Sequence, residues 1–148
     1  MLGPMVHLIA HYDKAVLPAR ATRGSFGYDI VVPAPVLIPA YPKGPTLVDS
    51  GWSLASDLPD GVAMMILPRS SLYMKHGLIV PNSPGLVDQD YAGPLKVMLQ
   101  NLTEQPVMLT EGTRIAQFVF VQCAMPSIYV TQERNPSRTR GGFGSTGA

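Results

Sequence analysis

The C-terminal residues carry the groups that a phosphorylated ligand with a planar base would need. Gly142 to Gly147 formally match G-x-G-x-x-G. A dinucleotide-binding loop needs a helix after the glycines, but only Ala148 follows, and a P-loop needs a Lys-Ser/Thr pair that is absent. Two interpretations remain. One is a disordered tail, and the other is an arm that contacts a nucleotide through Arg138 or Arg140, the ring of Phe143 and bare backbone N–H groups.

A second set of candidate residues lies between Asn82 and Gly93, a turn-rich, hairpin-like stretch. A carboxylate such as Asp88 can activate water when it is ionised and within hydrogen-bond reach. The ring of Tyr91 can pack on a sugar. The amide of Asn82 offers both a donor and an acceptor, which reading the edge of a base requires. The alternative is a solvated acidic hairpin that binds nothing.

Three shorter segments add carboxylate and anion-binding chemistry. Asp29 follows two glycines inside an apolar strand, so its charge needs a partner, either a backbone turn or a hydrated cation. Residues 68–72 join an arginine and two serines to a short helix, which gives either an anion site or an ordinary helix cap. Residues 112–117 carry Arg114 and Gln117, which could also be plain edge-strand residues.

The elements that must position these groups are mostly strands. Fifteen prolines and fourteen glycines in 148 residues exclude a helical bundle and favour short strands with tight turns, as in a sandwich, barrel or jelly roll. The only expected helix is 70–76, capped by a serine. The expected strands are 6–10, 28–32, 36–38, 46–54, 61–67, 78–80, 95–100, 107–109, 115–121 and 127–131.

Composition excludes several classes of function. A net charge of +1 gives no support for bulk binding to nucleic acid, and no signal peptide or membrane span is evident. The three histidines lack zinc-like spacing and are expected to be surface or structural residues. The single cysteine, Cys123, is expected in the core and indicates a reducing, cytoplasmic compartment.

Taken in chain order, five segments resemble the motifs of the trimeric dUTPase family. Any one of them is weak evidence, but five in order at compatible spacings, over 23–147, are specific. They are Gly27-Tyr28-Asp29-Ile30, Pro68-Arg69-Ser70-Ser71-Leu72, Gly85-Leu86-Val87-Asp88-Gln89-Asp90-Tyr91-Ala92-Gly93, Gly112-Thr113-Arg114-Ile115-Ala116-Gln117 and the terminal arm.

The resemblance implies an all-β, jelly-roll-like β-barrel (β-clip type) with one short helix. The barrel would span 1–131, and 132–148 would be a flexible arm that closes over the active site. It also implies a homotrimer whose three active sites are shared between subunits, which would account for the low content of charged residues, 14%. The activity would be Mg2+-assisted hydrolysis of dUTP to dUMP and pyrophosphate.

The resemblance also assigns roles to residues. Asp88 would be the general base for a water that attacks the α-phosphorus, and Asp29 would hold the magnesium through water. Tyr91 would stack on the deoxyribose. The uracil would be read by Asn82 and the backbone of Gly85, Leu86 and Val87, and the phosphates would be held by Arg69, Ser70 and Ser71. Lys96 and Gln117 fall at positions that contact ligand in relatives.

The arm would act as a lid over the bound nucleotide. Phe143 would stack on uracil, Arg138 would reach the γ-phosphate, and Gly144, Ser145 and Thr146 would add contacts to the ligand. Whether Arg138 or Arg140 closes the site is open.

Three departures from the family pattern leave the main roles in place: Ser71, Thr113 and Thr139 replace a glycine, an aspartate and a glycine. The alternatives are a dCTP deaminase of the same fold and a non-catalytic regulatory trimer. A deaminase needs a further acid/base group near the pyrimidine C4, whereas the hairpin here matches the uracil-reading pattern.

Overall fold

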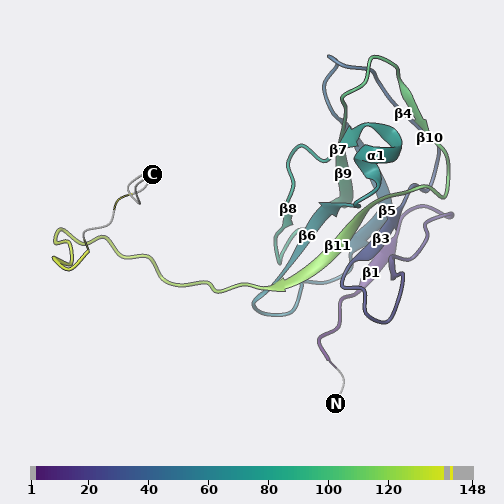
Figure 1. The fold of residues 1–148 in the computed structure, drawn as a ribbon. Coiled ribbons are helices and arrows are strands. Elements are labelled where there is room, and N and C mark those ends of the chain that lie inside the picture. Colours follow the sequence, from purple (N-terminus) through teal and green to yellow (C-terminus); the bar gives the residue numbers. More distant parts are fainter. Residues whose placement is uncertain (1–2, 139–140, 142–148) are drawn as a thin grey trace.

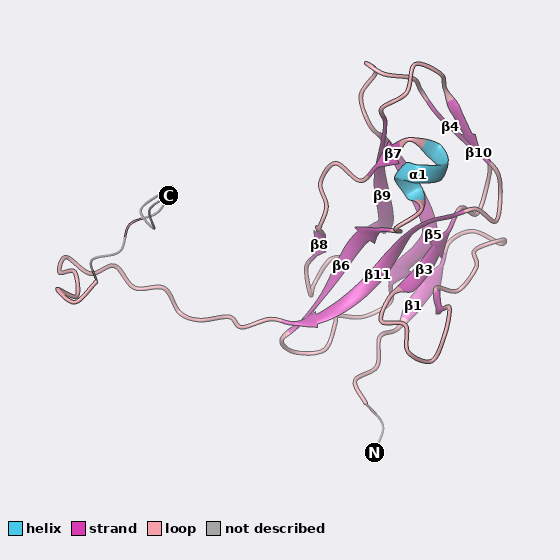
Figure 2. Cartoon of the chain, viewed as in Figure 1, coloured by secondary structure: helices cyan, strands magenta, loops and turns pink. Residues whose placement is uncertain are grey.

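The computed structural model describes residues 3–138 and 141, and within them the chain is built almost entirely of antiparallel strands (Figures 1 and 2). The elements are β1 (Leu8–Ala10), β2 (Ala19–Arg20), β3 (Tyr28–Val31), β4 (Val36–Ile38), β5 (Thr46–Leu54), β6 (Val62–Pro68), α1 (Leu72–His76), β7 (Leu78–Ile79), β8 (Gly85–Val87), β9 (Pro94–Asn101), β10 (Val107–Leu109) and β11 (Arg114–Gln122). The expected all-β fold with one short helix is confirmed.

The strands form two main sheets and a small ribbon. One sheet has the order β1-β5-β9-β7, the other has the order β2-β3-β11-β6-β8, and β10 pairs with β4. Every pairing is antiparallel. No helix in the described part of the chain is long and apolar enough to cross a bilayer.

Alternating side chains explain how the sheets enclose a core. In β9, Leu95, Val97 and Leu99 are buried while Lys96 faces outward, the period of two that an antiparallel strand with one wet face requires. Phe118 of β11 and Met64 of β6 are buried in the same cluster. Fully burying a side chain of this size contributes about 1.5–3 kcal/mol.

The structure corrects several expectations. The strand expected at 127–131 is wrong: these residues have no partner strand in the described chain and are exposed. Two strands were not expected. They are β2 and β8, and β8 pairs with β6 rather than within a local hairpin. Cys123 is half-buried rather than a core residue.

The helix is shorter than expected, because Ser70 lies in the turn before it. Ser71 is the N-cap residue, although no side-chain cap hydrogen bond forms. Gly77 ends the helix in the left-handed region at φ 63° and donates its N–H to Tyr73 O. The helix therefore spans one short turn between the end of β6 and the start of β7.

Substitution Gly77→Ala should lower stability by about 2 kcal/mol or more, because a Cβ would combine left-handed strain with overlap on the Thr103 side chain. The measurement is the thermal denaturation midpoint at matched protein concentration. Gly44→Ala is the control, since nothing lies within 4 Å of its Cβ position. Equal midpoints for the two variants would contradict this reading.

Candidate functional site

Three of the predicted site residues meet on the five-stranded sheet. Asp29 of β3 lies opposite Gln117 of β11. Gln117 in turn donates its Nε2–H to the carbonyl of Pro68, 3.0 Å away, at the end of β6. Arg69 follows directly and reaches back toward β3. The sheet order β3-β11-β6 thus brings together side chains from three distant segments.

The carboxylate of Asp29 is the centre of this group. Its Oδ1 lies 3.0 Å from Arg69 Nε, and its Oδ2 lies 3.3 Å from Arg114 NH1. The Asp29 side chain is only 15% exposed, against 28% for Arg69 and 54% for Arg114. Both carboxylate oxygens therefore face guanidinium groups, as a sheltered charge requires. The two arginines are therefore the partners of the Asp29 charge, in place of the backbone turn or hydrated metal ion expected from the sequence.

A β-bulge in β11 explains why Arg114 shares this face. Gln117 pairs with Asp29 and Arg114 pairs with Val31, but Ala116 pairs with Ile30, so β11 has one extra residue between these points. In a regular ladder the residue opposite Val31 would be Ile115, which is fully buried. The bulge places Ile115 in the core and turns Arg114 toward Asp29.

An open, basic pocket lies beside this group, with a volume of about 350 Å³. Its charged and ionisable lining comes from Arg69, Lys75, His76 and Arg114, with no carboxylate among the lining residues. The pocket is thus suited to an anion with several oxygens. Ser71 and Thr113 contribute polar groups to the same lining, whereas Ser70 is exposed beside it.

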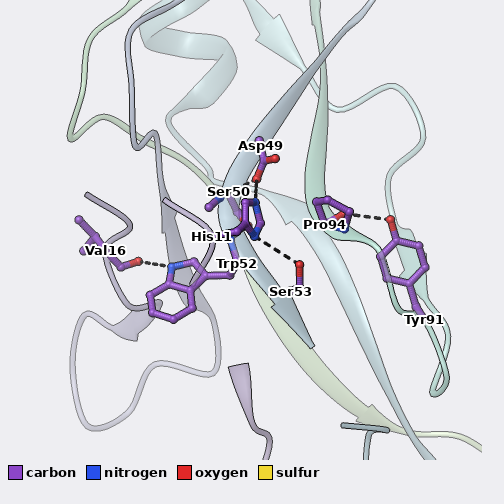
Figure 3. Close-up of polar contacts among 9 residues, drawn as sticks. His11, Val16, Asp49, Ser50, Trp52, Ser53, Tyr91 and Pro94 are labelled. Carbon is purple, nitrogen blue, oxygen red and sulfur yellow. Dashed lines mark hydrogen bonds and ion pairs between the residues drawn. The ribbon is translucent and has the colours of Figure 1, made fainter. Parts of the chain in front are cut away.

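The second group of predicted residues surrounds β8. Asn82 lies against Gly85, and a Cβ on that glycine would be 3.3 Å from the Asn82 amide nitrogen. The Tyr91 hydroxyl donates to the carbonyl of Pro94 at 2.9 Å, which fixes the ring (Figure 3). Asp88 is exposed, and its carboxylate makes no hydrogen bond or ion pair with any residue that the structure describes.

The turn that carries Asp88 is held by its neighbours. Gln89 donates its side-chain N–H to Asp60 at 3.0 Å and accepts from the backbone of Leu58 at 2.9 Å. These bonds tie the end of β8 to the turn before β6. Asp88 therefore projects from a fixed backbone while its own carboxylate remains free for a ligand or water.

Asp88 and Arg69 lie toward opposite ends of β6, whereas Gly85 pairs with Ile66 near the Pro68 end. Val87 pairs with Met64, so Asp88 follows toward the Val62 end, whereas Arg69 follows Pro68 at the other end. Arg69 is five positions after Met64, which corresponds to roughly 17 Å along an extended chain at roughly 3.3 Å per residue. Within one chain the backbone thus holds the predicted base and the predicted phosphate-binding arginine well apart.

The remaining predicted residues lie elsewhere. Lys96 lies in the four-stranded sheet, where it is exposed on β9 and pairs with Asp49 of β5. Leu86 is exposed on β8, while Gly85 and Val87 are buried. Arg138 is exposed and donates its backbone N–H to Asn135. Phe143, Gly144 and Ser145, together with Arg140 and Thr146, lie outside the described residues.

Some polar residues were not predicted as part of any site. Lys75 and His76 join the basic pocket because α1 turns them back toward Arg69, and no motif signals this. His11 lies 2.8 Å from Asp49 Oδ1 through Nε2 and 3.3 Å from the Ser53 hydroxyl through Nδ1 (Figure 3). Trp52 donates to Val16 O at 2.9 Å beside it. These contacts fasten the N-terminal segment to β5, which agrees with a structural histidine.

Comparisons with known proteins identify the same family that the sequence motifs resemble. The sequence model of the dUTPase family matches residues 13–147. A deoxyuridine 5'-triphosphate nucleotidohydrolase of Hydrogenobaculum sp. is 41% identical over 136 residues, covering 91% of this chain and 92% of the relative. One of the same name from Beijerinckia indica is 36% identical over 146 residues, covering 97% and 90%.

Solved structures share the fold. The dUTPase of Staphylococcus bacteriophage 80alpha with dUPNHPP has a TM-score of 0.84 at 21% identity, covering 97% of this chain and 99% of that one. A dUTPase variant from phage phi11 of S. aureus, described with a structural Mg(II) ion, has a TM-score of 0.77 at 18% identity, covering 87% and 97%. At such identities the likeness shows the fold alone.

The substitution Gly27→Ala should displace Gln117, because a Cβ at this position would overlap with the Gln117 side chain. Because the overlapping atoms are mainly the flexible end of that side chain, the cost should be near the low end of the about 1–3 kcal/mol of overpacking. The expected result is a lower denaturation midpoint and, in a crystal structure, loss of the bond between Gln117 and Pro68 O. Gly24→Ala is the matched control, with open space around its Cβ. An unmoved Gln117 in the Gly27 variant would refute the argument.

Proposed function

The chain belongs to the dUTPase family and hydrolyses dUTP to dUMP and pyrophosphate, and on this premise we propose that it does so as a homotrimer with sites shared between subunits. The observation that carries the proposal is the separation of Asp88 from Arg69 along β6. A base that activates water at the α-phosphorus and an arginine that holds the phosphates must act within one bound nucleotide. Two neighbouring chains can supply both residues to one nucleotide, and the separation along β6 supports this arrangement.

In the proposed reaction, Asp88 accepts a proton from the attacking water. Its exposed carboxylate has no partner in the described chain, so it is available for this role. The water oxygen forms a bond to the α-phosphorus, and the bond to the bridging oxygen breaks to release pyrophosphate. Arg69, Ser70 and Ser71 of another subunit bind the phosphate oxygens on which negative charge grows, and Lys75 and His76 lie beside them.

Recognition of the nucleoside follows from the geometry around β8. β8 is the last strand of its sheet, so one backbone edge has no partner strand in the described residues. That edge, from Gly85 to Val87, and the amide of Asn82 can pair with the donors and acceptors of uracil. A cytosine inverts these positions and leaves polar groups unpaired, which costs about 1–3 kcal/mol for each group. The ring of Tyr91 supports the deoxyribose.

Enzymes of this family use Mg2+. We propose that the phosphates and water hold the ion, rather than a set of protein ligands. The described residues contain no group of three or more His, Cys, Asp or Glu side chains that could hold a metal ion. The nearby oxygen donors are the Asp29 carboxylate and the Gln117 amide, a set that fits hydrogen bonds to a hydrated ion on the phosphates. Bound there, the ion would neutralise phosphate charge.

The C-terminal segment supports an assembly. Ile128, Tyr129 and Val130 are 93%, 86% and 98% exposed, and the segment leads away from the sheets in Figure 1. Three consecutive apolar side chains in water favour a partner surface. In the proposed trimer the arm, residues 132–148, closes the site: Phe143 stacks on uracil, Arg138 contacts the γ-phosphate, and Gly144 and Ser145 contact the ligand. Lys96 contacts the nucleotide from the body. We place the enzyme in the cytoplasm, in keeping with its single free cysteine.

The substrate panel that separates the alternatives is dUTP, dCTP and UTP with magnesium. The family assignment predicts pyrophosphate from dUTP, with at most trace turnover of the other two. Deoxyuridine nucleotides formed from dCTP would indicate a deaminase. Binding of dUTP without turnover would indicate a regulatory trimer.

Substitution Asp88→Asn should lower kcat by about 10²–10⁴-fold, because an amide cannot take the proton from water. Affinity for a non-hydrolysable dUTP analogue should change little. Asp90→Asn, at a neighbouring exposed carboxylate, is the control and should retain activity. Comparable losses in both variants, or near-normal turnover by Asp88→Asn, would remove Asp88 as the base.

Mixing two inactive variants tests the shared site. Trimers assembled at random from equal amounts of Asp88→Asn and Arg69→Ala chains should regain about a quarter of wild-type activity, because each site needs one intact residue from each of two chains. Chains are co-refolded or co-expressed, and trimer mass is checked by light scattering. Each variant alone is the control. No recovery in verified mixed trimers would mean that both residues act from one chain.

A further inference from the structure

The basic pocket depends on a three-residue ion cluster in which only Arg69 has been assigned a phosphate contact. Asp29 lies between Arg69, which follows β6, and Arg114 of β11, and each arginine contacts a different carboxylate oxygen. Neither Arg114 nor this use of Asp29 is part of the role assignments above.

The contact to Arg69 is made through Nε. Arginine carries donors on Nε and on both terminal nitrogens, so this contact leaves the terminal pair free. A terminal pair can bind two phosphate oxygens side by side, provided that the guanidinium plane is held in one orientation. With the Arg69 side chain only 28% exposed and its partner 15% exposed, the contact is sheltered enough to fix that plane.

Arg114 gives the cluster a net positive charge. Asp29 alone would cancel the positive charge of Arg69 and weaken its attraction for phosphate. Arg114 on the second oxygen leaves two positive charges against one negative charge, so the cluster keeps a surplus of one positive charge. The β-bulge that turns Arg114 toward Asp29 thus preserves both orientation and charge.

We propose that Asp29 and Arg114 are positioning residues that act on the bound phosphates through Arg69. Asp29 fixes the guanidinium plane, and Arg114 keeps the cluster cationic. The inference rests on the proposed function of this pocket as the phosphate site. It also gives Asp29 a role that is distinct from holding water on a magnesium ion.

A double-mutant cycle tests the proposal through binding rather than turnover. The probes are a non-hydrolysable dUTP analogue with Mg2+, and dUMP, which lacks the β- and γ-phosphates. Asp29→Asn should weaken the triphosphate analogue by about 10- to 100-fold, with little change for dUMP. Arg114→Gln should act in the same direction, but less, because Arg114 is more exposed. Glu104→Gln, at an exposed carboxylate, should have no effect.

The decisive comparison is made in the Arg69→Ala background. If Asp29 and Arg114 act through Arg69, their substitutions should have almost no further effect there. Full effects that persist without Arg69, or an Asp29→Asn loss abolished by excess Mg2+, would overturn the proposal. The proposed shared site is judged separately, because subunit mixing relies on activity and this cycle does not. Circular dichroism and denaturation midpoints show that each variant is folded.

Discussion

The antiparallel pairing of β6 with both β8 and β11 is the constraint on which the candidate site depends. β11 brings Gln117 and, through β3, Asp29 to the end of β6 that carries Arg69. β8 runs antiparallel to β6 on its other side and delivers Asp88 to the opposite end. The same strand therefore gathers the anion-binding residues and keeps the carboxylate base apart from them. An assembly is the simplest way to reunite two halves that the sheet separates.

Close approach of backbone and side chains does much of the local positioning. Gly27 leaves room for the Gln117 side chain, and Gly93 leaves room for the Tyr91 ring, because a Cβ on either glycine would overlap with it. In both places the glycine lets a predicted site residue lie close against the backbone. In both motifs, the absence of a side chain on glycine leaves the space that a neighbouring side chain occupies.

Most strands and the short helix could be predicted from the sequence because alternation and turn residues are local signals. The roles of the candidate site residues stay predictions. The placement of Arg114 could not be predicted, since it depends on a bulge defined only by pairing with β3. The partner of Asp29 was also missed, because Arg69 is 40 residues away in the sequence. The strand expected at 127–131 failed for a related reason: β propensity was present, but no partner edge lies beside it in the described chain.

The exposed apolar residues at 128–130 bear on whether the chain packs against a partner. Residues 128–130 have the composition of a buried strand, yet almost their whole surface is exposed. At about 25 cal/mol per Å², leaving such apolar area in water forgoes several kcal/mol that a partner surface would recover. The apolar pattern at 127–131 therefore did not correctly predict a strand or burial within this chain, and burial of these residues against a partner is part of the proposed assembly. The distance between Asp88, which follows β8, and Arg69, which follows β6, supports the same proposed assembly on chemical grounds.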